Sequence, residues 1–134
     1  MIPAEELIHQ HARAFSRLDW DAVREYWHPD GELVSPGGRW PVTSMRAIMR
    51  DLDAQYRDVD IQVTNVIQSA DESYIAFEWT YASTRRSDGA RSVTPDAIIV
   101  EFRDGLIYSW REYFDQSHSV ELGQPAAAAG ERLA

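Results

Sequence analysis

Glu112 stands in a segment whose pattern could turn an ordinary carboxyl group into an acid–base catalyst. Residues 106–115 alternate as in a β-strand, where successive side chains point to opposite faces, so four of them share one face: Tyr108, Trp110, Glu112 and Phe114. A carboxyl group among aromatic rings loses hydration, which raises its pKa and yields a base or a neutral acid near pH 7. The alternative is a glutamate that is hydrogen-bonded for structure or turned to solvent by a strand bulge.

Asp96 could supply a second carboxyl group beside Glu112. In the predicted strand 91–102 it shares a face with Ile98. Two adjacent carboxyl groups push their pKa values apart, which gives one acid and one base. Against this, Asp96 follows Pro95 at the start of a strand, where an exposed aspartate is common.

His28 and Tyr26 are further candidates for handling protons. Histidine titrates near neutral pH and is a natural proton shuttle. Tyr26 or Tyr81 could donate a hydrogen bond to a developing oxyanion. His28 could equally close a helix by binding its last carbonyl groups, and Tyr26 could be a core residue.

Five aromatic residues are predicted to bind a substrate as the apolar wall of a pocket: Trp27, Trp79, Tyr81, Trp110 and Phe114. Trp79 and Tyr81 share one face of the predicted strand 74–84. Such a wall excludes water and sets the shape of the molecule that can bind.

Several kinds of chemistry are excluded by residues that the sequence lacks. It has no cysteine, and all 13 basic residues are arginine, so thiolate nucleophiles and lysine Schiff bases are absent. His9 and His11 are two apart on a predicted helix and do not share a face, and His118 lies near the tail. Ser117 and Ser119 flank His118 without a nucleophile elbow. We therefore expect neither a metal nor a cofactor.

The charge balance argues against polyanionic partners. The formal net charge is -9, which repels phosphate backbones and anionic lipid surfaces, so we expect neither nucleic acid nor a membrane as a partner. The first eleven residues have no basic region followed by an apolar stretch, so no secretory signal is predicted and the expected location is the cytoplasm.

The elements that would position these side chains are helices followed by strands. Apolar residues recur at helical spacing in three segments, near 3–18, 19–27 and 43–52, and alternate at strand spacing in five: 31–36, 58–68, 74–84, 91–102 and 106–115. Short turns link the last four strands, which predicts an α+β domain with helices on one face of a mainly antiparallel sheet. We place a single domain at 1–120 and a flexible tail at 121–134.

Two segments carry a family resemblance. Residues 110–115, WREYFD, after Asp104-Gly105, and residues 26–31, YWHPDG, resemble SnoaL-like and limonene-epoxide-hydrolase-like proteins of the nuclear-transport-factor-2-like superfamily. The resemblance implies a conical barrel of a strongly curved sheet, with about three N-terminal helices closing a deep pocket. It also implies a homodimer packed through the outer face of the sheet.

The resemblance also bears on the reaction. In the similar epoxide hydrolases, the position matching Glu112 holds a catalytic aspartate that activates water. Their partner Arg-x-Asp pair is replaced here by Trp79 and Tyr81, which argues against the same epoxide chemistry. We therefore predict a cofactor-independent acid–base cyclase, isomerase, lyase or hydrolase for an apolar polyketide- or terpenoid-like molecule. The alternative is a small-molecule-binding or accessory protein without catalysis.

Overall fold

The computed structural model describes residues 2–115 and 120–122, which form three helices and one sheet, with two strands between the second and third helices. The helices are α1 (Ala4–Phe15), α2 (Trp20–Val23) and α3 (Met45–Gln55), with single 3-10 turns at Arg24–Tyr26 and Val42–Ser44. The strands are β1 (Trp27–Ser35), β2 (Gly38–Pro41), β3 (Tyr56–Gln68), β4 (Tyr74–Arg85), β5 (Arg91–Arg103), β6 (Leu106–Tyr113) and β7 (Val120–Leu122). His118, Ser117 and Ser119 lie outside the described residues.

The strands follow the order β2-β1-β6-β5-β4-β3, and β7 pairs with β5. Strands β3 to β6 pair as consecutive antiparallel neighbours, whereas β1 runs parallel to β6. This confirms the predicted α+β class with a mostly antiparallel sheet. The conical curvature stays a prediction.

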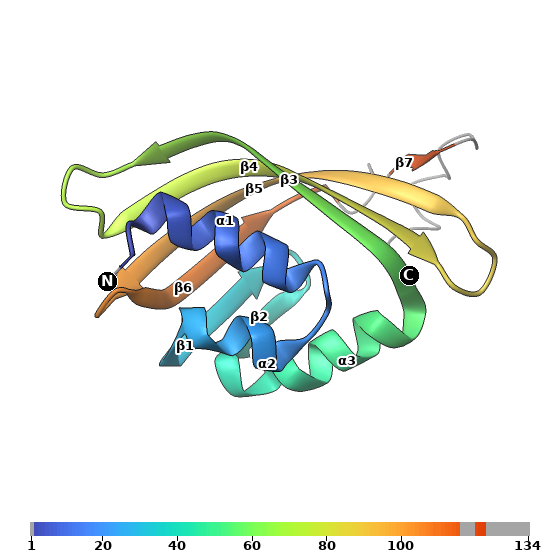
Figure 1. Ribbon diagram of the computed structural model, residues 1–134, viewed down its shortest axis with the longest axis horizontal. Coiled ribbons are helices and arrows are strands. Elements are labelled where there is room, and N and C mark those ends of the chain that lie inside the picture. Colours follow the sequence, from blue (N-terminus) through green and yellow to red (C-terminus); the bar gives the residue numbers. More distant parts are fainter. Residues whose placement is uncertain (1, 116–119, 123–134) are drawn as a thin grey trace.

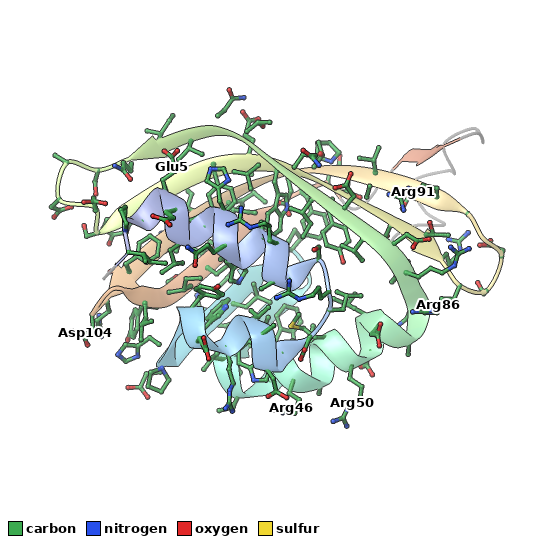
Figure 2. All side chains as sticks on the ribbon, in the orientation of Figure 1. Glu5, Arg46, Arg50, Arg86, Arg91 and Asp104 are labelled. Atoms are coloured by element: carbon green, nitrogen blue, oxygen red, sulfur yellow. The ribbon has the colours of Figure 1, made fainter. Side chains whose placement is uncertain are left out.

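Helix α1 covers one face of the sheet (Figure 1) because one side of it is apolar. Leu7, Ile8 and Ala12 recur at helical spacing and are at most 5% exposed. They pack into a core with inward side chains of the sheet such as Phe77 and Val100. The labelled side chains Glu5 of α1 and Arg46 and Arg50 of α3 point away from that core (Figure 2), as an amphipathic helix requires.

The second predicted helix is shorter than expected. The Asp19 carboxylate accepts a hydrogen bond from the Asp21 backbone N–H at 3.0 Å, so the predicted cap is confirmed. The helical conformation then ends at Tyr26, and β1 begins at Trp27 instead of residue 31. The physical reason is that Trp27 pairs with Ile107 of β6, which extends the strand to that residue.

A β-bulge interrupts β6 and changes which side chains face inward. Glu101 pairs with Ser109 but the next residue, Phe102, pairs with Ile107, so Tyr108 is the extra residue. The prediction that Tyr108 shares a face with Trp110 is therefore wrong. Ile107 takes the inward position with no exposed surface, whereas Tyr108 stacks under the Arg103 guanidinium.

The C-terminal end of the described chain pairs with the sheet. Strand β7 is antiparallel to β5, with Val120 opposite Val93 and Leu122 opposite Arg91. The pairing extends across the boundary placed at residue 120, and residues 123–134 of the predicted tail lie outside the described part. Within residues 2–115 and 120–122, none of the helices combines the length and apolarity needed to cross a bilayer.

Candidate active site

A cavity of about 380 Å³ lies between the helices and the inward face of the sheet. All five aromatic residues predicted as its wall line it: Trp27, Trp79, Tyr81, Trp110 and Phe114. Leu33, Ile48 and Leu52 add aliphatic surface from β1 and α3. The cavity is large enough for a small organic molecule and most of its lining is apolar.

Glu112 and Asp96 are the acidic residues in the lining of this cavity, and they come from neighbouring strands. Glu112 of β6 pairs with Ile98 of β5, and Asp96 lies two residues before Ile98 on the same face. Diagonal neighbours of this kind are close enough for long side chains to touch. The two carboxyl groups are close enough for each to shift the pKa of the other.

Burial raises the pKa values of both carboxyl groups. Loss of hydration, together with the negative charge of Asp96, raises the pKa of Glu112 to about 8. Loss of hydration also raises the pKa of Asp96, while its hydrogen bonds to Glu112 and Trp79 oppose that rise. Because its pKa is raised to about 8, Glu112 is the member of the pair that holds a proton near pH 7.

Two indole groups orient the pair. Nε1 of Trp110 donates to Oε1 of Glu112 at 2.6 Å, and Nε1 of Trp79 donates to Oδ2 of Asp96 at 3.0 Å. Trp79 is opposite Asp96 in the β4–β5 register, and Trp110 is two residues before Glu112. Each carboxyl group thus has one oxygen fixed by an indole, which leaves its other oxygen for the shared proton or a bound molecule.

Comparison with known proteins identifies the family of the chain. A family model described as a SnoaL-like domain matches residues 8–110, which is most of the chain. The chain belongs to the SnoaL-like domain family. No curated protein matches it in sequence.

Solved structures share the fold of this SnoaL-like domain. A Catenulispora acidiphila protein with a ketosteroid-isomerase-like fold, solved with trimethylamine, is 19% identical with a TM-score of 0.77, over 93% of this chain and 95% of that one. A proposed polyketide cyclase from Pseudomonas putida is 23% identical with a TM-score of 0.75, over 84% and 92%. An epoxide hydrolase from M. tuberculosis, resembling limonene epoxide hydrolase, is 21% identical with a TM-score of 0.70, over 84% and 83%. At these identities the likeness shows the fold alone.

Tyr81 of the SnoaL-like domain presents a hydroxyl group without a partner. Its Oη is buried and makes no hydrogen bond. Loss of hydration and the nearby Glu112 carboxyl group raise the pKa of this phenol, so it stays protonated. Since Tyr81 lines the cavity, this hydroxyl group is a candidate donor to a bound molecule.

The structure does not bring His28 and Tyr26 into the cavity. Nδ1 of His28 accepts from the Asp30 backbone N–H, and its ring packs edge-on against Tyr108. The Tyr26 hydroxyl group donates to Gln10 at 3.4 Å. Neither side chain is among those that line the cavity, although Tyr26 packs against the core beside His11.

His11 lines the cavity of the SnoaL-like domain and was not predicted as a site residue. It is 1% exposed, and its ring centroid lies 4.7 Å from that of Trp110. The signal in the sequence was its spacing, since Leu7, His11 and Phe15 follow one another at four-residue intervals on the buried side of α1. Its two-residue spacing from His9 gives no indication of that position.

Metal binding finds no support in the described residues. Among them, no three histidine, cysteine, aspartate or glutamate side chains are grouped so that they could hold a metal ion. The chemistry that the cavity can perform with its own side chains is proton transfer between Glu112, Asp96 and a bound molecule.

Proposed function

We propose that this SnoaL-like domain is a cofactor-independent acid–base enzyme that acts on an apolar small molecule. The observation that carries the proposal is the pair Asp96 and Glu112, which are diagonal neighbours on adjacent strands and line a cavity of otherwise mostly apolar lining. A charged carboxylate is costly in such a place and is more reactive as a base there than in water. The range of reactions is that of a cyclase, isomerase, lyase or hydrolase.

The pair supplies both halves of a proton transfer. Asp96, as the carboxylate, takes a proton from a C–H group next to a carbonyl group of the substrate, and the electron pair of that C–H bond moves towards the carbonyl oxygen to form an enolate. Glu112, as the neutral acid, returns a proton to another atom. Proton transfer from Asp96 to Glu112 then restores the starting state, since diagonal neighbours of this kind are close enough for their side chains to touch.

Tyr81 completes this proposal as the donor to the developing oxyanion. Its hydroxyl group is buried, protonated and without a partner. A donor already in place stabilises charge as it develops, at no reorganisation cost. Polyketide- and terpenoid-like molecules suit the cavity because they combine large apolar surface with carbonyl groups, and one relative of the same fold is a proposed polyketide cyclase.

The experiment is deuterium exchange, which detects proton abstraction before the product is known. The protein is incubated in D₂O with 2-tetralone, an apolar ketone with acidic C–H groups, and loss of the α-proton signals is followed by NMR. We expect exchange above the buffer rate, reduced about a hundredfold or more in Asp96→Asn and in Glu112→Gln. His28→Gln is the matched control, because His28 does not line the cavity.

A binding role without chemistry is the competing function. It is favoured by Trp79 and Tyr81, which occupy the positions where similar epoxide hydrolases have an arginine and a second acid. Saturable binding of 2-tetralone with exchange at the buffer rate would support this role and overturn the enzymatic one.

We also propose that the outer face of the sheet forms a homodimer. Ile67, Ala76, Ile99 and Arg111 pair in one row across four strands. Ile67 is 72% exposed and Ile99 37%, an apolar surface that a second copy could cover. Light scattering after gel filtration should give twice the chain mass, and Ile99→Arg should give the monomer. A monomeric wild-type protein would contradict the proposal.

A further inference from the structure

His11 is held in one tautomer by a neighbouring tryptophan. Nε1 of Trp27, which carries a hydrogen and can only donate, lies 3.1 Å from Nε2 of His11. Nε2 must therefore accept, and the single proton of a neutral imidazole is on Nδ1. Complete burial lowers the pKa of His11 to about 3, so the ring stays neutral at physiological pH.

The Nδ1–H group of this tautomer is a donor with nothing to donate to. Nδ1 of His11 is buried and has no hydrogen-bond partner. An unpaired buried donor costs free energy, so most buried polar groups are paired. By contrast, His9 on the exposed side of the same helix has a charged neighbour, since its Nε2 lies 3.9 Å from the Glu5 carboxylate. The unpaired nitrogen of His11 therefore requires an explanation.

The unpaired atoms of the described residues are concentrated in one place. Three buried side-chain polar atoms lack a partner, namely Nδ1 of His11, Oη of Tyr81 and Oδ1 of Asp96, and all three residues line the cavity. The Phe15 ring lies 5.9 Å from the His11 ring and 6.2 Å from the Tyr81 ring, so the two donors flank one aromatic side chain. Polar groups of the cavity are thus left unpaired where a bound molecule would pair them.

We propose that His11 is a neutral hydrogen-bond donor that binds an acceptor oxygen, of the carbonyl class, on the apolar ligand of this cavity. Trp27 is its positioning residue, because its indole fixes the tautomer without touching the ligand oxygen. The inference rests on the proposed ligand cavity and adds to it a second donor beside Tyr81. The ligand must therefore carry at least one carbonyl-type oxygen within an apolar skeleton.

The first test measures the tautomer directly. In protein labelled with ¹⁵N at histidine, the two ring nitrogens of His11 are distinguished by their chemical shifts, which are assigned by elimination with single variants of the other three histidines, His9, His28 and His118. We expect a protonated Nδ1 and an unprotonated Nε2 across pH 5 to 8, and loss of this preference in Trp27→Phe. A proton on Nε2 of the wild-type protein would overturn the inference.

The second test uses two probes of nearly the same shape. 2-Acetylnaphthalene carries a carbonyl oxygen, and 2-isopropenylnaphthalene has a CH₂ group in its place. By calorimetry we expect the ketone to bind about fivefold more tightly, the size of one neutral hydrogen bond. His11→Phe should reduce this preference, and in the wild-type protein the Nδ1–H signal should shift with the ketone but not with the alkene.

The outcomes distinguish a failure of the inference about His11 from a failure of the proposed ligand cavity. If Tyr81→Phe removes the preference and His11→Phe keeps it, Tyr81 is the donor and the inference about His11 is wrong. Binding of neither probe would overturn the proposed ligand cavity, and the inference with it. The chemical shift in the wild-type protein decides the question even where His11→Phe fails to fold.

Discussion

Asp96 and Glu112 are diagonal neighbours on the inward face of the sheet, because the β5 partner of Glu112 is Ile98, two residues after Asp96. This register explains why two acidic side chains meet in a mostly apolar cavity. A shift of one residue in either strand would turn one of them to the outer face. The pairing of β5 with β6 is therefore what creates the candidate acid–base pair.

The first prediction is that the pKa of Glu112 falls in Asp96→Asn. Burial makes the largest contribution to the wild-type value of about 8, and the negative charge of Asp96, which the substitution removes, makes the next largest. Titration of the Glu112 carboxyl carbon by NMR measures it, with Glu112→Gln to assign the signal. Glu101→Gln is the control, because Glu101 bonds Tyr74 on an exposed part of the sheet. An unchanged pKa in Asp96→Asn would contradict the coupling.

The second prediction is that the pKa of Glu112 rises in Trp110→Phe. The indole N–H donates to the carboxylate and stabilises its charged form, which lowers the pKa. Removing that donor leaves burial and Asp96 to act unopposed. The same NMR titration measures the change, and Trp40→Phe is the control, since it alters another wall residue of the cavity but not this donor. A fall in the pKa would show that Trp110 acts mainly by excluding water.

The third prediction concerns stability against pH. The pKa of Glu112 is raised from 4.5 to about 8 in the folded state, so its contribution to stability is complete below pH 4.5 and is lost as the pH rises through 8. His11, lowered from 6.5 to about 3, contributes fully above pH 6.5 and loses that contribution as the pH falls towards 3. Below pH 6.5 the two groups change the free energy of unfolding in opposite directions as the pH changes. Above pH 6.5 only Glu112 contributes to its pH dependence.

Between pH 6.5 and 8 the free energy of unfolding should therefore fall by about 2 kcal/mol. Urea denaturation at several pH values measures it. Glu112→Gln, which cannot titrate, should remove this fall while keeping the loss of stability at low pH. A wild-type curve that is flat over the same interval would mean that Glu112 keeps an ordinary pKa.

The alternation of strand residues was sufficient to predict much of the site. Because period two fixes which side chains share a face, Trp79, Asp96, Trp110 and Glu112 could be placed together from the sequence. Alternation failed at Tyr108, because a bulge depends on how β6 pairs with both of its neighbours, and no local pattern records that.

The remaining differences also come from tertiary context. The start of β1 at Trp27 was not predicted, because the aromatic residues Tyr26 and Trp27 suit a helix as well as a strand. Pairing of Trp27 with β6 decides in favour of the strand. His11 was missed because a polar residue on an apolar stripe is visible as a site residue only once the Trp27 indole and the cavity are in place. The sequence indicates which face is buried, but it does not indicate where that face remains unfilled.

The fourth prediction tests whether the apolar side of α1 stabilises the packing of this helix on the sheet. Ile8 has no exposed surface and lies one turn before His11, so Ile8→Ala removes core contacts from the helix that carries both His11 and Phe15. We expect the free energy of unfolding to fall by about 2–5 kcal/mol, as for other buried large-to-small substitutions. Arg13→Ala, on the exposed side of α1, should change it by less than about 0.5 kcal/mol. Urea denaturation compares the two variants, and equal effects would show that α1 does not depend on its apolar side for docking.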